Sequence, residues 1–259
     1  MSAEAIDWSV LWPAFAAGLL VLATHVPLGI EVLRRGIIFI DLAIAQFAAL
    51  GVITAQLLGW ESALAVQGAA ALAALAGAVL LTLAERRWPE MLEALIGLSF
   101  VLAASAGILL LSGNPHGGEH LKDLLGGQIL WVGPRQLITA AVVAAAVLAL
   151  WFSRAMGRRG FYLLFAVTVT VSVQLVGVFL VFASLIAPAV ATRRAAHAPL
   201  RRLAASYLIG AAGYGAGLLL SARYDLPSGS AIVCAMCVLA LAALLLGGNA
   251  PRGIDARRA

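Results

Sequence analysis

Ionisable and amide side chains are rare within the long apolar stretches of this sequence, and three of them have the chemistry to bind a cation. His25 lies in the first apolar stretch, and Asp41 and Gln46 lie in the second. A buried carboxylate needs a compensating cation, proton or arginine, and an ionisable residue at membrane depth commonly marks a transport path. Gln46 follows Asp41 by five residues, so on a helix it points about 140° away from it. Asp41 and His25 are therefore the main candidates for a metal-binding path, with Gln46 as an additional one.

Each of these residues also has a structural interpretation. Asp41 could pair with an arginine or a backbone group, and His25 could be a packed histidine with satisfied nitrogens. Gln46 could form an interhelical hydrogen bond, because amide side chains commonly join helices within membranes. The spacing of the residues is compatible with both interpretations.

The most polar connection, SGNPHGGEHLKDLLGG (112–127), places His116, Glu119 and His120 within five residues. Imidazole and carboxylate ligands suit zinc, and they suit other first-row metals less selectively. This outer loop is therefore a second candidate metal site, and a solvated loop without a ligand is the alternative. Cys234 and Cys237 form a C-x-x-C pair inside an apolar stretch, where packing is the expected role.

Sequence motifs for catalysis are absent. The chain has no P-loop pattern of the form G-x-x-x-x-G-K-S/T, and its single lysine cannot supply one. Neither H-E-x-x-H nor G-x-S-x-G occurs. We therefore expect no enzymatic activity and no permanently bound cofactor. If transport needs ATP, a separate chain must hydrolyse it.

The composition indicates that helices in a membrane position these residues. Hydrophobic residues make up 63% of the 259 residues and charged residues only 11%, against about a quarter in soluble proteins. The mean hydropathy is +1.02. Such a composition excludes a secreted disulfide scaffold, a disordered protein and an ordinary cytosolic enzyme. The net charge of +5 comes from arginines at the ends of apolar stretches, which favours a membrane protein over a nucleic-acid-binding one.

Apolar stretches of about 20 residues, the length that crosses a bilayer, predict an all-α, polytopic transmembrane helical bundle of about eight to nine membrane segments. The stretch 161–192 is too long for one helix, and Gly177 at its middle predicts a turn between two short segments, which could be re-entrant. The other expected segments are 9–30, 36–58, 62–83, 91–112, 134–152, 203–220 and 228–247.

The basic residues support two crossings at 161–192. Two crossings place 14 of the 17 Lys and Arg residues on one side of the membrane, whereas a single crossing divides them 8 to 9. The positive-inside rule makes the rich side the cytoplasm, with the N-terminus outside and the C-terminus inside. Glu4 and Asp7 stand where a cleavable signal peptide has basic residues, so the first stretch is expected to remain. We expect a single membrane domain, 1–259, with short tails at 1–8 and 248–259.

Four segments resemble the membrane permease of zinc, manganese and iron ABC importers. They are LRRGIIFIDLAIAQFAALG (33–51), LLGGQIL (124–130), VQLVGVFLVFASLIAPAVATR (173–193) and YDLPSGSAIV (224–233). Their order and spacing agree with the family, and the resemblance covers about residues 10–247. It implies a homodimeric or pseudo-dimeric helical permease of the cell (inner) membrane, with a metal path along the dimer axis.

The resemblance also implies roles for particular residues. The second-span motif of the family has an aspartate and, four residues later, a histidine, and this pair is implicated in metal coordination. Asp41 matches the aspartate, but Ala45 stands in place of the histidine, which leaves His25 as the available imidazole. The short helix that docks on the ATPase in the family corresponds to about 184–194, which contains Ser184, Pro188, Arg193 and Arg194.

We therefore expect the permease subunit of an ATP-driven divalent metal importer, which forms the translocation path and docks a separate ATPase. Zinc is the first candidate because the outer loop contains two histidines, and manganese or iron would favour more oxygen ligands. The expected partners are an ATP-binding subunit, a periplasmic or extracellular metal-binding protein, a second copy of the chain and membrane lipid, but no nucleic acid. The alternative is a proton-coupled secondary transporter of a cation, with Asp41 and His25 as a relay.

Overall fold

The computed structural model describes residues 8–111, 128–153, 160–195 and 198–246. Within these ranges the chain forms nine α-helices and three short 3-10 turns, and it forms no β-strand. The expected all-α fold is confirmed. The helices are α1 (Trp8–Arg35), α2 (Ile40–Leu57), α3 (Ala63–Arg87), α4 (Leu92–Leu111), α6 (Pro134–Phe152), α7 (Gly160–Val176), α8 (Val178–Ala191), α9 (Pro199–Tyr224) and α10 (Ser228–Leu246).

The turn predicted within 161–192 is confirmed at Gly177. Among the described residues, seven helices are long and apolar enough to cross a membrane, and α7 and α8 form an additional pair bent by 119°. A bend of more than a right angle turns α8 back toward the end from which α7 starts. Gly177 has φ 83° and ψ 162°, a conformation that only glycine adopts readily. The 14 residues of α8 span about 21 Å, which is shorter than a hydrocarbon core of about 30 Å.

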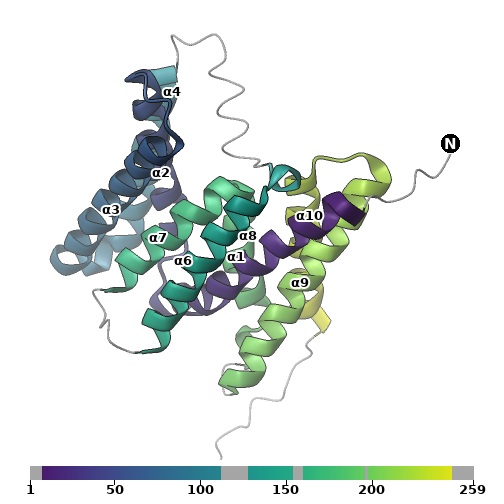
Figure 1. Ribbon diagram of the computed structural model, residues 1–259. Coiled ribbons are helices and arrows are strands. Elements are labelled where there is room, and N and C mark those ends of the chain that lie inside the picture. The colour runs from purple at the N-terminus through teal and green to yellow at the C-terminus, as the bar shows by residue number, and fades with distance from the viewer. Residues whose placement is uncertain (1–7, 112–127, 154–159, 196–197, 247–259) are drawn as a thin grey trace, which may run out of the picture.

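The helices pack in two groups, joined by α6 and α7. α2, α3 and α4 lie side by side at the left of Figure 1, and α3 also packs on α7. In the second group, α1 packs on α8 and α9, and α10 packs on the same two helices. α6 and α7 contact each other and α1. As a result α1, which carries His25, and α2, which carries Asp41, belong to different groups.

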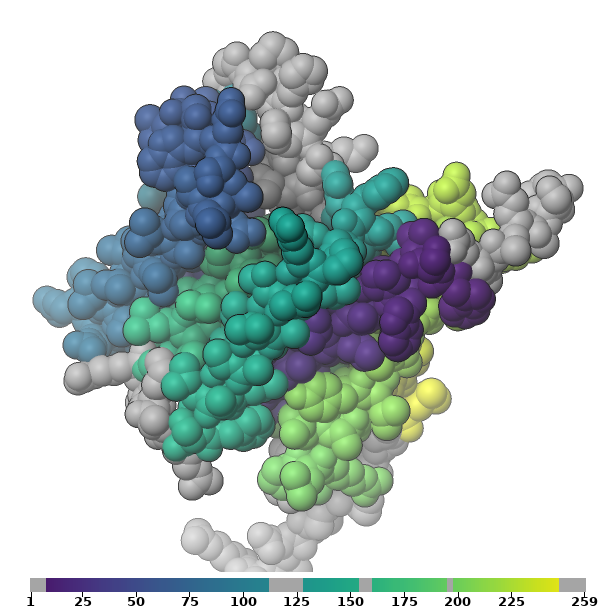
Figure 2. Space-filling view, in the orientation of Figure 1, coloured from purple at the N-terminus to yellow at the C-terminus, as the bar shows by residue number. Residues whose placement is uncertain are grey.

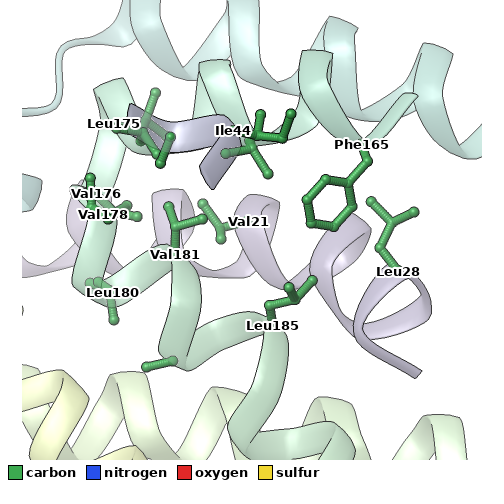
Figure 3. Close-up of a cluster of buried hydrophobic side chains, with 14 of the residues drawn as sticks. Val21, Leu28, Ile44, Phe165, Leu175, Val176, Val178, Leu180, Val181 and Leu185 are labelled. Atoms are coloured by element: carbon green, nitrogen blue, oxygen red, sulfur yellow. The ribbon is translucent and has the colours of Figure 1, made fainter. Parts of the chain in front are cut away.

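The buried core lies between α1, α2, α7 and α8. Figure 3 shows Val21 and Leu28 of α1, Ile44 of α2, Phe165 of α7 and Leu185 of α8 in one cluster. These side chains are at most 2% exposed. Because α1 and α2 come from different packing groups, this cluster is where the two groups meet.

Glycines let the helices of the second group approach each other closely. A Cβ at Gly29 of α1 would meet the backbone carbonyl oxygen of Leu185 in α8, so these two helices touch through their backbones. A Cβ at Gly213 of α9 would lie 2.9 Å from the Cβ of Met236 in α10. Close packing of this kind stabilises helix pairs in lipid, where the hydrophobic effect does not hold them together.

Large apolar side chains cover the outside of the bundle. Leu64, Leu102, Ile138, Leu208 and Leu245, from five different helices, are each at least 65% exposed. Figure 2 shows α1, α6 and α9 side by side on one such face. An apolar surface of this extent is stable against lipid rather than water. The exposed faces of the helices therefore face hydrocarbon.

Basic side chains mark one end of the bundle. Arg34 and Arg35 end α1, and Glu31 accepts from both of them, with N–O distances of 2.7 Å. The guanidinium of Arg35 also lies 4.2 Å from the centroid of the Phe161 ring at the start of α7. Glu31 thus pairs with both arginines within α1, and Arg35 also joins the end of α1 to the start of α7.

Candidate functional site

Asp41 is the second residue of α2 and is completely buried. Neither of its carboxylate oxygens has a hydrogen-bond partner among the described residues. Arg34 and Arg35 are both bonded to Glu31, and among the described residues Asp41 forms no pair with an arginine. A buried carboxylate without a partner is costly, and the start of a helix offsets only part of that cost. A cation passing this point would supply the missing charge.

His25 is completely buried in α1, and its hydrogen bonds leave one ring nitrogen available. Its Nδ1 lies 2.9 Å from the carbonyl oxygen of Val21. Because a carbonyl oxygen only accepts, Nδ1 carries the hydrogen and donates it, and Nε2 therefore holds a lone pair. Nε2 has no partner among the described residues. A backbone bond to one nitrogen with the other free is the arrangement typical of a metal-binding histidine.

Asp41 and His25 each lie on a helix face that also carries residues of the buried cluster. Asp41 shares a face of α2 with Ile44, and His25 shares a face of α1 with Val21 and Leu28. Those three apolar residues belong to the cluster between α1, α2, α7 and α8 (Figure 3). His25 lies ten residues before the end of α1, or about 15 Å along the helix axis, whereas Asp41 lies in the first turn of α2. The two residues are therefore at different depths.

In the described part of the chain, few metal-ligand side chains lie in the buried interior of the bundle. Within the described residues, no three His, Cys, Asp or Glu side chains gather in one group. Asp41 and His25 each offer one ligand group at their different depths, and Glu31, the other buried carboxylate of the described residues, is bonded to Arg34 and Arg35. A single ligand group at each depth would suit an ion that must leave again, because a closed four-ligand cage is typical of structural metal sites.

Gln46 is buried but belongs to a different face of α2 from Asp41. It shares its face with Leu50, which lies against Gly107 of α4. Ala45, where the family has histidine, is on the Asp41 side of α2 and is completely buried. The structure thus places Gln46 on the face of α2 that contacts α4, whereas Asp41 and Ala45 lie on another face of α2.

The remaining metal-ligand candidates differ in outcome. His116, Glu119 and His120 lie outside the described residues, so the outer-loop site stays a prediction.

The packing role predicted for the cysteines is wrong, because Cys234 and Cys237 are both exposed. They line an apolar groove of about 460 Å³ between α8 and α10. Which face of α10 is buried depends on its neighbours α8 and α9, and the short C-x-x-C pattern holds no information about them.

The predicted ATPase-docking segment has a buried part and an exposed part. Ser184 and Pro188 lie within α8 and are buried. Arg193 and Arg194 follow the helix in a 3-10 turn and are exposed. Of these four residues, Arg193 and Arg194 are therefore the two that another subunit can reach. Ser184 and Pro188 pack inside the bundle.

Two pairs of hydroxyl groups, which the sequence analysis missed, join α8 to α9. The Ser184 and Tyr214 hydroxyl oxygens are 2.8 Å apart, and those of Thr192 and Ser206 are 2.7 Å apart. All four residues are buried. The partners are 30 and 14 residues apart in the chain, and they meet only because α9 runs back along α8. No local sequence pattern could have identified them.

A protein-family model described as the ABC 3 transport family matches residues 7–157 and 156–247, which is most of the chain. The chain belongs to the ABC 3 transport family. It is thus a permease of a metal-type ABC importer and a multi-pass protein of the cell membrane, as the sequence resemblance predicts. Catalysis is not a property of such permeases, whose ATPase is a separate chain.

Two solved structures share the fold of this ABC 3 permease. A chain of PsaBC from Streptococcus pneumoniae, in complex with Fab, is 21% identical, with a TM-score of 0.74 over 92% of both chains. A chain of a metal-chelate type ABC transporter in an inward-facing conformation is 17% identical, with a TM-score of 0.56. That match covers 95% of the present chain and 81% of the other. At these identities the likeness establishes a common fold.

Proposed function

We propose that this ABC 3 permease conducts a divalent metal ion, with zinc as the first candidate, along a path lined by Asp41 and His25. One observation carries the proposal. Both side chains are completely buried, lie on helix faces that also carry residues of one buried cluster, and hold ligand atoms without partners among the described residues. Carboxylate oxygen and imidazole nitrogen bind zinc, and they also suit manganese and iron.

The different depths of the two residues suggest a direction for the path. An ion would meet His25 deeper in the bundle and Asp41 near the arginine-bearing end, which the positive-inside rule assigns to the cytoplasm. The helices that carry them belong to different packing groups. A movement of one group relative to the other would therefore change the distance between the imidazole and the carboxylate, and so bind or release the ion.

The proposal includes partners that supply energy and metal. A second copy of the chain, a separate ATP-binding subunit and a metal-binding protein outside the membrane complete the importer. Arg193 and Arg194 are proposed to contact the ATP-binding subunit because they are exposed at the end of α8. The loop with His116, Glu119 and His120 is proposed to capture metal on the outer side. Membership in an ABC family favours ATP-driven transport over the proton-coupled alternative.

The test measures uptake of zinc, manganese and iron in cells that lack their own importers and express the permease with its ATPase and binding protein. Replacement of His25 by alanine should reduce uptake far more than replacement of Gln46 by alanine, because Gln46 faces α4. Equal uptake in the two variants would contradict the role of the imidazole. Uptake that persists when the ATPase is inactive would instead support the secondary transporter.

A further inference from the structure

We infer that the Ser184–Tyr214 and Thr192–Ser206 hydroxyl pairs hold the end of α8 at a fixed position on α9. When a docked ATPase moves, α8 and α9 then move together and displace α1, whereas a loosely held α8 would shift alone. These four are positioning residues and touch neither metal nor nucleotide. The inference rests on the proposed function, in which Arg193 and Arg194 contact the ATPase.

The first pair lies in the interior and joins three helices. Ser184 Oγ donates to the carbonyl oxygen of Leu180 at 2.7 Å, so its own hydrogen is already used. The Tyr214 hydroxyl therefore donates to Ser184 Oγ, at 2.8 Å. Tyr214 is completely buried, and its ring fills the space beside Gly18 of α1, where a Cβ would clash with it. A single side chain of α9 thus contacts both α8 and α1.

The second pair completes the end of α8. Thr192 Oγ1 donates to the carbonyl oxygen of Pro188 at 2.9 Å, so Ser206 Oγ donates to Thr192 Oγ1 at 2.7 Å. Arg202 of α9 adds a bond of 3.4 Å to the carbonyl oxygen of Ala189. The last carbonyls of a helix have no donors within the helix itself. Here Arg202 of α9 supplies such a donor for the carbonyl oxygen of Ala189, shortly before the docking arginines.

These bonds matter because the rest of α8 is held by apolar packing on α1 and α10, with no continuous helix before it. The helix is only 14 residues long, and Gly177 separates it from α7. Apolar packing has little directionality, so without the bonds to α9 the end of this short helix would slide along its neighbours when the docking arginines are pushed. With them, α8 is tied to α9 and touches the backbone of α1 at Gly29. Gly29 is one turn from His25, so a push at Arg193 would move the imidazole relative to α2.

The test removes single hydroxyl groups without leaving a buried partner unsatisfied. In Tyr214→Phe, Ser184 still donates to Leu180, and in Thr192→Val, Ser206 still lies 3.3 Å from the Pro188 carbonyl oxygen. The complete complex of permease, ATPase and binding protein is reconstituted in liposomes, and zinc transported per ATP hydrolysed is measured. Each variant should lower this ratio about fivefold, the change equivalent to one net hydrogen bond of about 1 kcal/mol. Binding of the ATPase should not change.

Two controls make the result specific. Thr192→Ser keeps the hydroxyl and should keep the wild-type ratio, and so should Tyr224→Phe, the same change at the exposed outer end of α9. A wild-type ratio in both Tyr214→Phe and Thr192→Val would overturn the inference and leave the proposed function intact. An equal fall in the two controls would also overturn it. A wild-type complex that hydrolyses ATP but moves no metal would refute the proposed function itself.

Discussion

Replacement of Asp41 by asparagine removes the ability to carry a negative charge and leaves the size of the side chain nearly unchanged. The structure predicts two effects of this substitution. Asp41 is completely buried and its oxygens have no partners among the described residues, so the neutral amide should be easier to accommodate. If the carboxylate binds the transported ion, the same change should abolish uptake. Stability and transport are therefore expected to change in opposite directions.

The size of each effect follows from the burial of the side chain. An unsatisfied buried polar group destabilises a protein by about 1–3 kcal/mol. For a chain of this length, about 1 kcal/mol corresponds to about 2–4 °C in Tm, so the Asp41→Asn permease should unfold at the same temperature or several degrees higher. Loss of a group that only supports a metal ligand already costs about 10–100-fold in affinity. Loss of the ligand itself should lower uptake by at least about 100-fold.

The assay compares metal uptake by the complete importer with the Tm of the purified permease in detergent. Glu61→Gln is the matched control, because it neutralises an exposed carboxylate in the turn between α2 and α3 and should change neither quantity. Uptake that survives Asp41→Asn would refute the intramembrane path. A fall in both uptake and Tm would show that Asp41 has a structural partner, and would equally contradict the reasoning.

Further substitutions test the packing and the topology. Gly29→Ala should lower the Tm by more than about 5 °C because its Cβ meets the backbone of α8. Gly68→Ala, in open space on α3, should instead raise stability by up to about 1 kcal/mol. Equal shifts in the Tm of the two variants would disprove the close contact at Gly29. Gly177→Ala should cost about 1–3 kcal/mol because φ is 83° there, and an unchanged Tm would show that the bend tolerates a side chain. In a cysteine-free permease, a cysteine at Glu61 should react with an impermeant reagent from outside and one at Ala198 should not. The reverse pattern would invert the topology.

The membrane segments could be predicted closely from the sequence because they depend on local properties. An apolar stretch long enough to cross a bilayer forms a helix wherever it lies in the chain, since its backbone groups must bond to each other in lipid. The break at Gly177 was also visible, because a glycine at the middle of an overlong apolar stretch permits the turn that α7 and α8 make. The exposure of Cys234 and Cys237 was not visible, since it depends on which helices lie beside α10.

The sequence by itself determined the helices, their approximate ends and the few polar residues that they bury. Only the tertiary structure decided what those polar residues contact. Among the described residues Asp41 has no partner, whereas Glu31 binds both Arg34 and Arg35. His25 bonds the carbonyl oxygen of Val21 through Nδ1, which leaves a lone pair on Nε2. The bonds between α8 and α9 likewise depend on how distant helices are packed. Helix formation is a property of neighbouring residues, whereas the satisfaction of a buried polar atom depends on atoms brought to it from elsewhere in the chain.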